Sequence, residues 1–184
     1  RGPGMGSIRV SGYRSVPVTK RVQSMIDHPC FQRLRKVRQL GPIHWVYPGA
    51  THTRFEHSIG VYGTTREFLI HLLQFPEFAS RFSDAQLLGV LAAGLLHDLG
   101  HYPFAHSLEA VHHAGGDTPR HETLGADILM GRFPQLHPGA PPLCDLLRWE
   151  WQTSPELVAR LITESPEALP SDDERLLKSI ISGT

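Results

Sequence analysis

The sequence predicts an all-α protein, and three observations support this fold class. Apolar residues recur at helical spacing, capping signals precede several apolar runs, and no alternating apolar and polar pattern lasts long enough for a sheet. The chain has 184 residues, of which 40% are hydrophobic. This length and composition predict a single helical domain with one core.

The first half of the chain predicts helices separated by proline and glycine signals. Residues 20–28 show helical spacing, and Pro29 begins a second helix that extends to Leu40 and is basic on its outer face. Gly41 and Pro42 end this helix, and residues 43–53 predict a loop. A long helix over 55–73 follows. One of its faces carries His57, Val61, Thr64, Phe68 and His71.

The second half predicts a central buried helix and several shorter ones. Ser83 and Gln86 match a capping box before the apolar run 85–96. Gly100 permits a turn, and Pro103 begins a helix that a glycine pair at 115–116 closes. Further helices are expected at 121–130, 143–151, 155–163 and 172–182, with a proline-rich loop at 133–142. The tryptophans at 149 and 151 belong either to the core or to a subunit contact.

Composition argues against several classes of protein. The net charge is zero at pH 7, so non-specific affinity for nucleic acid or membranes is not expected. Cys30 and Cys144 lie far apart, which argues against a disulfide framework and for a reducing compartment. No apolar run approaches the roughly 18 residues of a membrane span. We therefore expect a cytoplasmic protein with no membrane partner, and residues 1–7 resemble the remnant of an expression tag.

Two adjacent metal-ligand side chains, His97 and Asp98, end the apolar run. Imidazole and carboxylate suit a divalent transition metal such as Mn²⁺, Fe²⁺, Zn²⁺ or Ni²⁺. Neighbouring side chains on a helix point about 100° apart, so both reach one ion only where the helix is interrupted. A third ligand must come from elsewhere, and His57 is the best candidate because Arg54 and Glu56 flank it. A hydrogen-bonded core dyad without metal is the alternative.

Two strings resemble the HD-domain phosphohydrolases. They are Arg54-Phe55-Glu56-His57-Ser58-Ile59-Gly60 and His97-Asp98-Leu99-Gly100-His101-Tyr102-Pro103-Phe104-Ala105-His106. Together with residues 31–35, 39–41 and 48–50, they resemble the deoxynucleoside triphosphate triphosphohydrolase branch of that superfamily.

The resemblance implies a role for each motif residue. His57, His97 and Asp98 would ligate the metal, and Arg54, Gln39 and Leu40 would bind substrate, the first at phosphate and the others at the sugar. An acid–base group would consist of His101, Glu109 and His121, with Glu109 where the family usually has aspartate. The implied reaction is attack of water on the α-phosphorus of a deoxynucleoside triphosphate, with Mg²⁺ as the nucleotide counter-ion. Nucleoside and triphosphate would be released.

The resemblance also implies a domain organisation. Residues 8–184 would be the N-terminal portion of an HD domain that stops before a fourth ligand, an aspartate, and this piece alone would have little or no activity. An HD-type nucleotide monophosphatase or nuclease, and a nucleotide-binding regulatory module without turnover, are the alternative functions. A homo-oligomer and single-stranded nucleic acid are alternative partners, the latter through the basic residues Arg33, Arg35, Lys36 and Arg38.

Overall fold

The protein is represented by a computed structural model that describes residues 6–10, 15–103 and 120–182. The described chain is mainly helical, and so the predicted all-α class is confirmed. Its α-helices are α1 (Lys20–Asp27), α2 (Pro29–Gln32), α3 (Arg54–Leu72), α4 (Pro76–Arg81), α5 (Asp84–Leu96), α7 (His121–Leu129), α8 (Leu143–Trp149), α9 (Pro155–Thr163) and α10 (Asp172–Ser182). Short 3₁₀ helices are η1 (Arg33–Lys36), η2 (Gly41–Trp45), η3 (Pro134–Leu136) and η4 (Pro166–Ala168).

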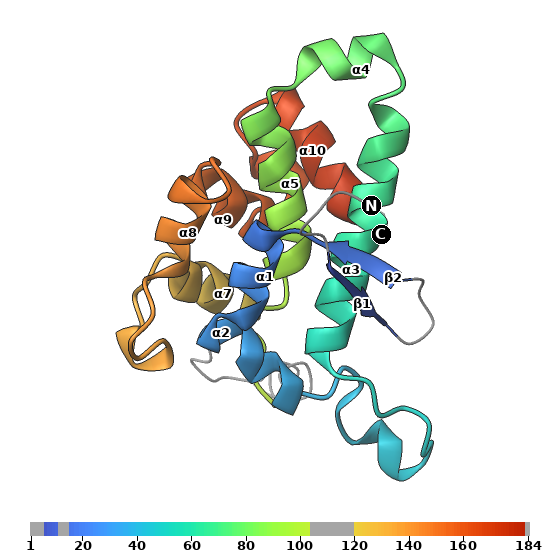
Figure 1. The fold of residues 1–184 in the computed structure, drawn as a ribbon, viewed down its shortest axis with the longest axis vertical. Coiled ribbons are helices and arrows are strands. Elements are labelled where there is room, and N and C mark those ends of the chain that lie inside the picture. Colours follow the sequence, from blue (N-terminus) through green and yellow to red (C-terminus); the bar gives the residue numbers. More distant parts are fainter. Residues whose placement is uncertain (1–5, 11–14, 104–119, 183–184) are drawn as a thin grey trace.

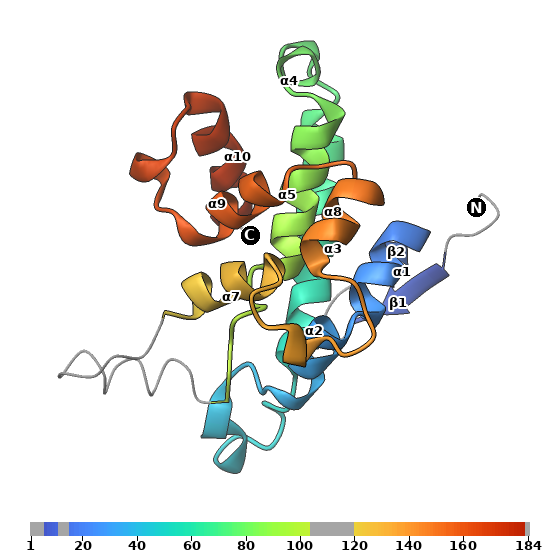
Figure 2. The same ribbon diagram turned by 90° about the vertical axis from the view of Figure 1, so that its left-hand side faces the viewer.

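Helices α3 and α5 run side by side through the middle of the fold, joined at one end by α4 (Figure 1). Helices α9 and α10 lie on one side of this pair, and α1 lies with the N-terminal strands on the other (Figure 2). Close approach of α3 to α5 depends on Gly94, because a Cβ there would come within 2.9 Å of the buried Thr65 Oγ1. The α3–α5 pair therefore forms the frame on which the remaining elements are arranged.

The capping box on α5 is confirmed. The backbone N–H of Gln86 donates to Ser83 Oγ, and Gln86 Oε1 accepts from the backbone N–H of Ser83. Most of α5 beyond its second turn is buried, as expected for a helix that is apolar on nearly all sides. None of the helices in the described residues is both long and apolar enough to span a membrane.

A short antiparallel hairpin departs from the expectation of no sheet. Strand β1 (Gly6–Arg9) pairs with β2 (Ser15–Val18), so that Gly6 faces Val18 and Ser7 faces Pro17. Val16 and Val18 are buried, but an alternation over four residues is too short to distinguish from chance. The hairpin includes the last two residues of the segment we assign to a tag remnant.

The helix predicted from Pro29 to Leu40 is wrong in its second half. Helix α2 ends at Gln32, η1 ends at Lys36, and Val37 is extended. From there the chain pairs with residues 52–54, as Arg54 donates its backbone N–H to Val37 and Gln39 donates to His52. Pairing with a segment distant in sequence therefore overrides the local helical pattern.

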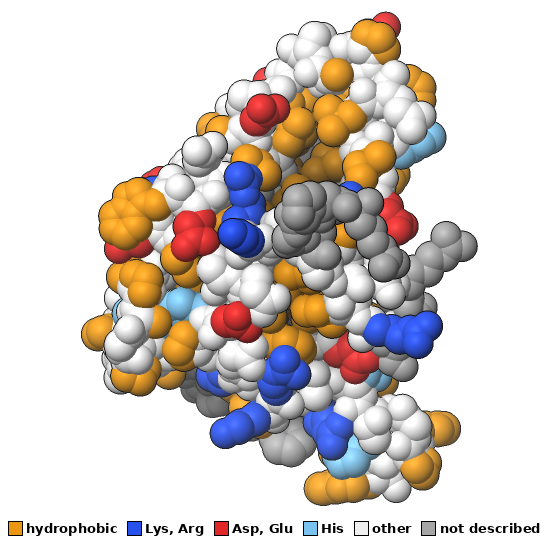
Figure 3. Space-filling view, in the orientation of Figure 1, with side chains coloured by type: hydrophobic (Ala, Val, Ile, Leu, Met, Phe, Trp, Pro, Cys, Tyr) orange, Lys and Arg blue, Asp and Glu red, His pale blue; other side chains and the backbone are white. Residues whose placement is uncertain are grey.

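The face of α3 that carries Phe68 and His71 is not its buried face. Phe68 is 46% exposed and His71 is exposed, whereas Phe55, Ile59 and Tyr62 form the buried apolar face. Two further segments differ from expectation. Residues 43–53, expected to be a loop or short irregular connection, begin within η2, where exposed apolar side chains gather at the lower right of Figure 3. Helix α8 ends before Trp151, which is fully buried while Trp149 is 70% exposed.

Candidate metal centre

Three potential ligands from two helices meet at one end of the α3–α5 pair, the lower end in Figure 1. His57 lies in the first turn of α3, and His97 and Asp98 follow the last residue of α5. One donor atom from each lies within 4.8 Å of the other two. No other group of three His, Cys, Asp or Glu side chains comes this close in residues 6–10, 15–103 and 120–182.

The two imidazoles are oriented for metal binding. His97 Nδ1 lies 2.9 Å from the carbonyl oxygen of Gly94, which leaves Nε2 3.4 Å from Asp98 Oδ1. His57 Nε2 lies 3.9 Å from Asp98 Oδ2. A metal-binding histidine usually donates its other ring N–H to a backbone or carboxylate oxygen. The residues present therefore fit a divalent metal ion with two histidines and one carboxylate.

Protonation states also suit a metal site. Burial lowers the pKa of His57, although the carboxylate of Asp98 opposes this effect, so the neutral form that binds metals is favoured. Burial of Asp98 would raise its pKa, but His97, His101 and Arg54 together hold that pKa below its usual value. Both groups thus have their metal-binding charge state near neutral pH.

Arg54 lies beneath the ligands rather than at the surface. Its side chain is 5% exposed, and Nη1 donates to Asp98 Oδ2 over 2.9 Å. A buried guanidinium of this kind neutralises the carboxylate and orients it. Contact of Arg54 with a substrate phosphate stays a prediction.

A second histidine pair adjoins the ligands. The side chain of His101 is 2% exposed, and its Nδ1 lies 3.2 Å from Asp98 Oδ1. The rings of His101 and His121 lie with centroids 3.8 Å apart, and His121 Nε2 is 3.4 Å from Glu122 Oε1. The predicted acid–base histidines are therefore adjacent, while Glu109 lies outside the described residues.

Residues 97–100 form the turn expected at Gly100. The φ of Gly100 is not positive, so the turn does not require the left-handed conformation of a glycine. Instead, a Cβ at Gly100 would overlap the carbonyl oxygen of His121 and the backbone of Gly125. The absence of a side chain lets α7 pack directly on the corner after α5, which brings His121 to His101.

Sequence reasoning missed Arg33, which we placed on a solvated basic face. Its guanidinium donates to the backbone carbonyl oxygens of Leu99 and His101, the latter over 2.6 Å. Arg33 thereby holds the segment that carries Asp98 and His101. The only indication of this role in the sequence was the position of Arg33 in the string Phe31-Gln32-Arg33-Leu34-Arg35. A local sequence pattern does not predict contacts with distant residues.

The predicted sugar-binding residues lie on the segment that pairs with the start of α3. Gln39 donates its backbone N–H to His52, which places it beside the segment that leads to Arg54. Its side-chain Oε1 is buried with no hydrogen-bond partner in the described part of the chain, and Leu40 is 41% exposed. A buried acceptor without a partner is available for a ligand.

Comparison with known proteins agrees with this geometry. Residues 54–180 match the HD domain family. The chain belongs to this family. It is therefore a member of a superfamily of metal-dependent phosphohydrolases, as the resemblance predicted.

Relatives of this HD domain are considerably longer. This chain is 36% identical over 154 residues to the uncharacterized protein MG461 homolog of Mycoplasma pneumoniae, and the match covers 84% of this chain and 34% of that protein. It is 48% identical over 85 residues to the deoxynucleoside triphosphate triphosphohydrolase SAMHD1 of Homo sapiens, covering 46% of this chain and 13% of that protein. The crystal structure of a hypothetical protein from Aquifex aeolicus has a TM-score of 0.68 and 31% identity, covering 97% of this chain and 42% of that one.

Proposed function

We propose that this HD domain is part of an enzyme that hydrolyses deoxynucleoside triphosphates to nucleoside and triphosphate. The proposal rests on one observation, that Asp98 lies beside the candidate metal ligands and also beside an acid–base histidine. Its carboxylate faces the candidate ligands His57 and His97 and also the acid–base candidate His101. The similarity to SAMHD1, over 85 residues, supports this substrate class.

When bound, a divalent metal would activate the attacking water and draw negative charge from the phosphoryl oxygens. The chain's own residues would do the rest. Arg54 holds the carboxylate of Asp98 in place, and Gln39 presents its buried Oε1 to the sugar. Water adds to the α-phosphorus as the bond from phosphorus to the 5′ oxygen breaks.

His101 would protonate the departing 5′ oxygen. Its Nδ1 faces Asp98, and its Nε2 would be the ring nitrogen that gives up the proton. The proton released by the attacking water would restore His101 after each turnover by way of His121, whose ring centroid lies 3.8 Å from that of His101. General acid catalysis of this kind contributes about 10²- to 10⁴-fold to the rate.

Product analysis tests the proposal directly. The protein of residues 1–184, and any longer natural form in which these residues are found, would be incubated with each deoxynucleoside triphosphate and Mn²⁺. Inorganic triphosphate and deoxynucleoside in equal amounts would support it. Orthophosphate with a nucleoside diphosphate, shortened oligonucleotides from a single-stranded DNA substrate, or nucleotide binding without products would each contradict it.

A further inference from the structure

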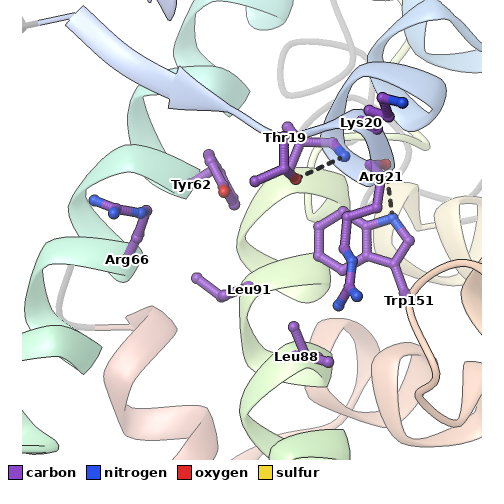
Figure 4. A pocket seen from close by; sticks show the side chains of 9 residues that line it. Thr19, Lys20, Arg21, Tyr62, Arg66, Leu88, Leu91 and Trp151 are labelled. Carbon is purple, nitrogen blue, oxygen red and sulfur yellow. Dashed lines mark hydrogen bonds between the residues drawn. The ribbon is translucent and has the colours of Figure 1, made fainter. Parts of the chain in front are cut away.

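A cavity of about 410 Å³ lies between the start of α1 and the α3–α5 pair (Figure 4). Its walls include Tyr62 and Arg66 from α3, Leu88 from α5 and Trp151 after α8. Arg66 follows the candidate ligand His57 by nine residues, which is about 13 Å along a helix. The cavity is therefore separate from the candidate metal centre, and its size falls in the usual range for small-molecule sites.

The cavity is lined by positive charge that the described part of the chain does not neutralise. Lys20, Arg21 and Arg66 line it, and none of the described lining residues is acidic. The structure shows no ion pair or hydrogen bond for these three side chains within residues 6–10, 15–103 and 120–182. By contrast, Arg54 and Arg160 each pair with a carboxylate. Three cationic groups without counter-charge around one cavity favour an anionic ligand.

Apolar groups form the opposite part of the same cavity. Leu88 and Leu91 of α5 are only half-buried, and their side chains point into the space between α3 and Trp151 (Figure 4). The fully buried indole of Trp151 donates its N–H to the carbonyl oxygen of Arg21 over 3.0 Å. This bond holds the start of α1, and with it Arg21, against the apolar surface.

Tyr62 adds a polar donor between the two arginines. Its side chain is 3% exposed and lines the cavity. Burial raises the pKa of the Tyr62 hydroxyl, and the charges of Arg66 and Arg21 both oppose this effect. The hydroxyl therefore lies within the field of both guanidinium groups, and it is a further donor on the wall between them (Figure 4).

From this arrangement we infer that the cavity binds a small organic phosphate with an apolar body. Its phosphate would contact the guanidinium group of Arg21, with Lys20 at the exposed edge, and its apolar body would lie on Leu88 and Leu91. Phosphate is favoured over carboxylate because its larger negative charge is attracted by all three cationic side chains that line the cavity. This binding is independent of the proposed phosphohydrolase activity.

Isothermal titration calorimetry with 1-naphthyl phosphate tests the inference, in EDTA so that no metal takes part. Inorganic phosphate provides the anionic group alone and 1-naphthol the apolar group alone. The phosphate ester should bind at least about tenfold more tightly than either, and Arg21→Ala should weaken it about tenfold, the loss of one charge-assisted hydrogen bond. Equal affinity for the ester and for 1-naphthol would overturn the inference.

Two further variants identify the site. Arg132→Ala removes one charge from an arginine that is 68% exposed and lies outside the cavity lining, and His97→Ala alters the candidate metal centre. Both should bind 1-naphthyl phosphate like the unaltered protein. If His97→Ala abolished binding while Arg21→Ala did not, the ester would occupy the metal centre and the cavity assignment would be wrong.

Discussion

Arg33 Nη1 donates a 2.6 Å hydrogen bond to the carbonyl oxygen of His101, which lies 68 positions later in the chain. The same guanidinium also donates to the carbonyl oxygen of Leu99. Two bonds from one planar group define the course of the chain between the candidate ligand Asp98 and the acid–base candidate His101. The 3₁₀ helix η1 therefore supports the site without contributing a ligand.

Arg33→Met should weaken metal binding although Arg33 touches no ligand atom. Loss of outer supporting groups typically lowers metal affinity about 10- to 100-fold, and we expect a change in this range by calorimetric titration with Mn²⁺. Lys36→Met, an exposed neighbour on η1, is the matched control and should bind metal normally. Unchanged affinity in a folded Arg33→Met protein would show that the corner after α5 holds its shape without Arg33.

His97→Ala should remove bound metal. One of three protein ligands is lost, so near-stoichiometric metal in the purified protein should fall to a small fraction, as measured by inductively coupled plasma mass spectrometry. His71→Ala, which alters an exposed histidine on α3, controls for histidine content. Equal metal in both variants would exclude the cluster as the site.

Arg54→Met should destabilise the protein most when metal is absent. It leaves the carboxylate of Asp98 buried without its guanidinium partner, and breaking a buried ion pair costs about 3–5 kcal/mol. A bound cation would supply part of the missing positive charge, so the loss in free energy of unfolding should shrink when Mn²⁺ is present. Urea unfolding with EDTA and with Mn²⁺ measures both values. A loss of the same size in the two conditions would show that a bound metal ion does not replace the charge of Arg54.

His101→Gln and His121→Gln should reduce turnover and retain metal. If His101 is the general acid, triphosphate release should fall about 10²- to 10⁴-fold, with the smaller loss for His121. Both variants should keep the metal content of the unaltered protein, which distinguishes a proton-transfer role from a ligand role. Normal turnover in His101→Gln would assign the proton donor elsewhere.

The folded protein should become less stable at acidic pH, in part because of His28. Burial lowers the pKa of His28 below 6.5, and so the folded protein binds its proton more weakly than the unfolded chain. The resulting loss in the free energy of unfolding is absent above pH 6.5 and grows as the pH falls below that value. In the folded protein, His28 Nδ1 accepts from the backbone N–H of Cys30, and Nε2 lies 2.9 Å from the Pro141 carbonyl oxygen.

His28→Asn should reduce this pH dependence, because asparagine does not titrate yet can still cap α2 through its oxygen. Urea unfolding at pH 7.5 and pH 5.5 measures the difference in free energy for each protein. The variant should lose stability at pH 7.5, where the Pro141 contact is missing, but lose less than the unaltered protein on acidification. An equal decline in both would assign the acid sensitivity to other groups.

The sequence alone determined the features that depend on neighbouring residues. The capping box of Ser83 and Gln86 and the proline at the start of α9 act within one helical turn, so they mark helix boundaries without reference to the rest of the fold. The pair of His97 and Asp98 could also be recognised from the sequence, because two adjacent metal-binding side chains end an apolar run there.

Tertiary structure decided which distant groups meet. Arg33, Arg35 and Lys36 look alike in sequence, yet Arg33 alone of these three donates to the carbonyl oxygens of the corner after α5. Likewise, the inner face of α3 and the cavity between Arg21 and Arg66 depend on elements packed from elsewhere in the chain. Helical periodicity and capping act over about four residues, whereas these contacts join segments tens of residues apart, and so only packing selects them.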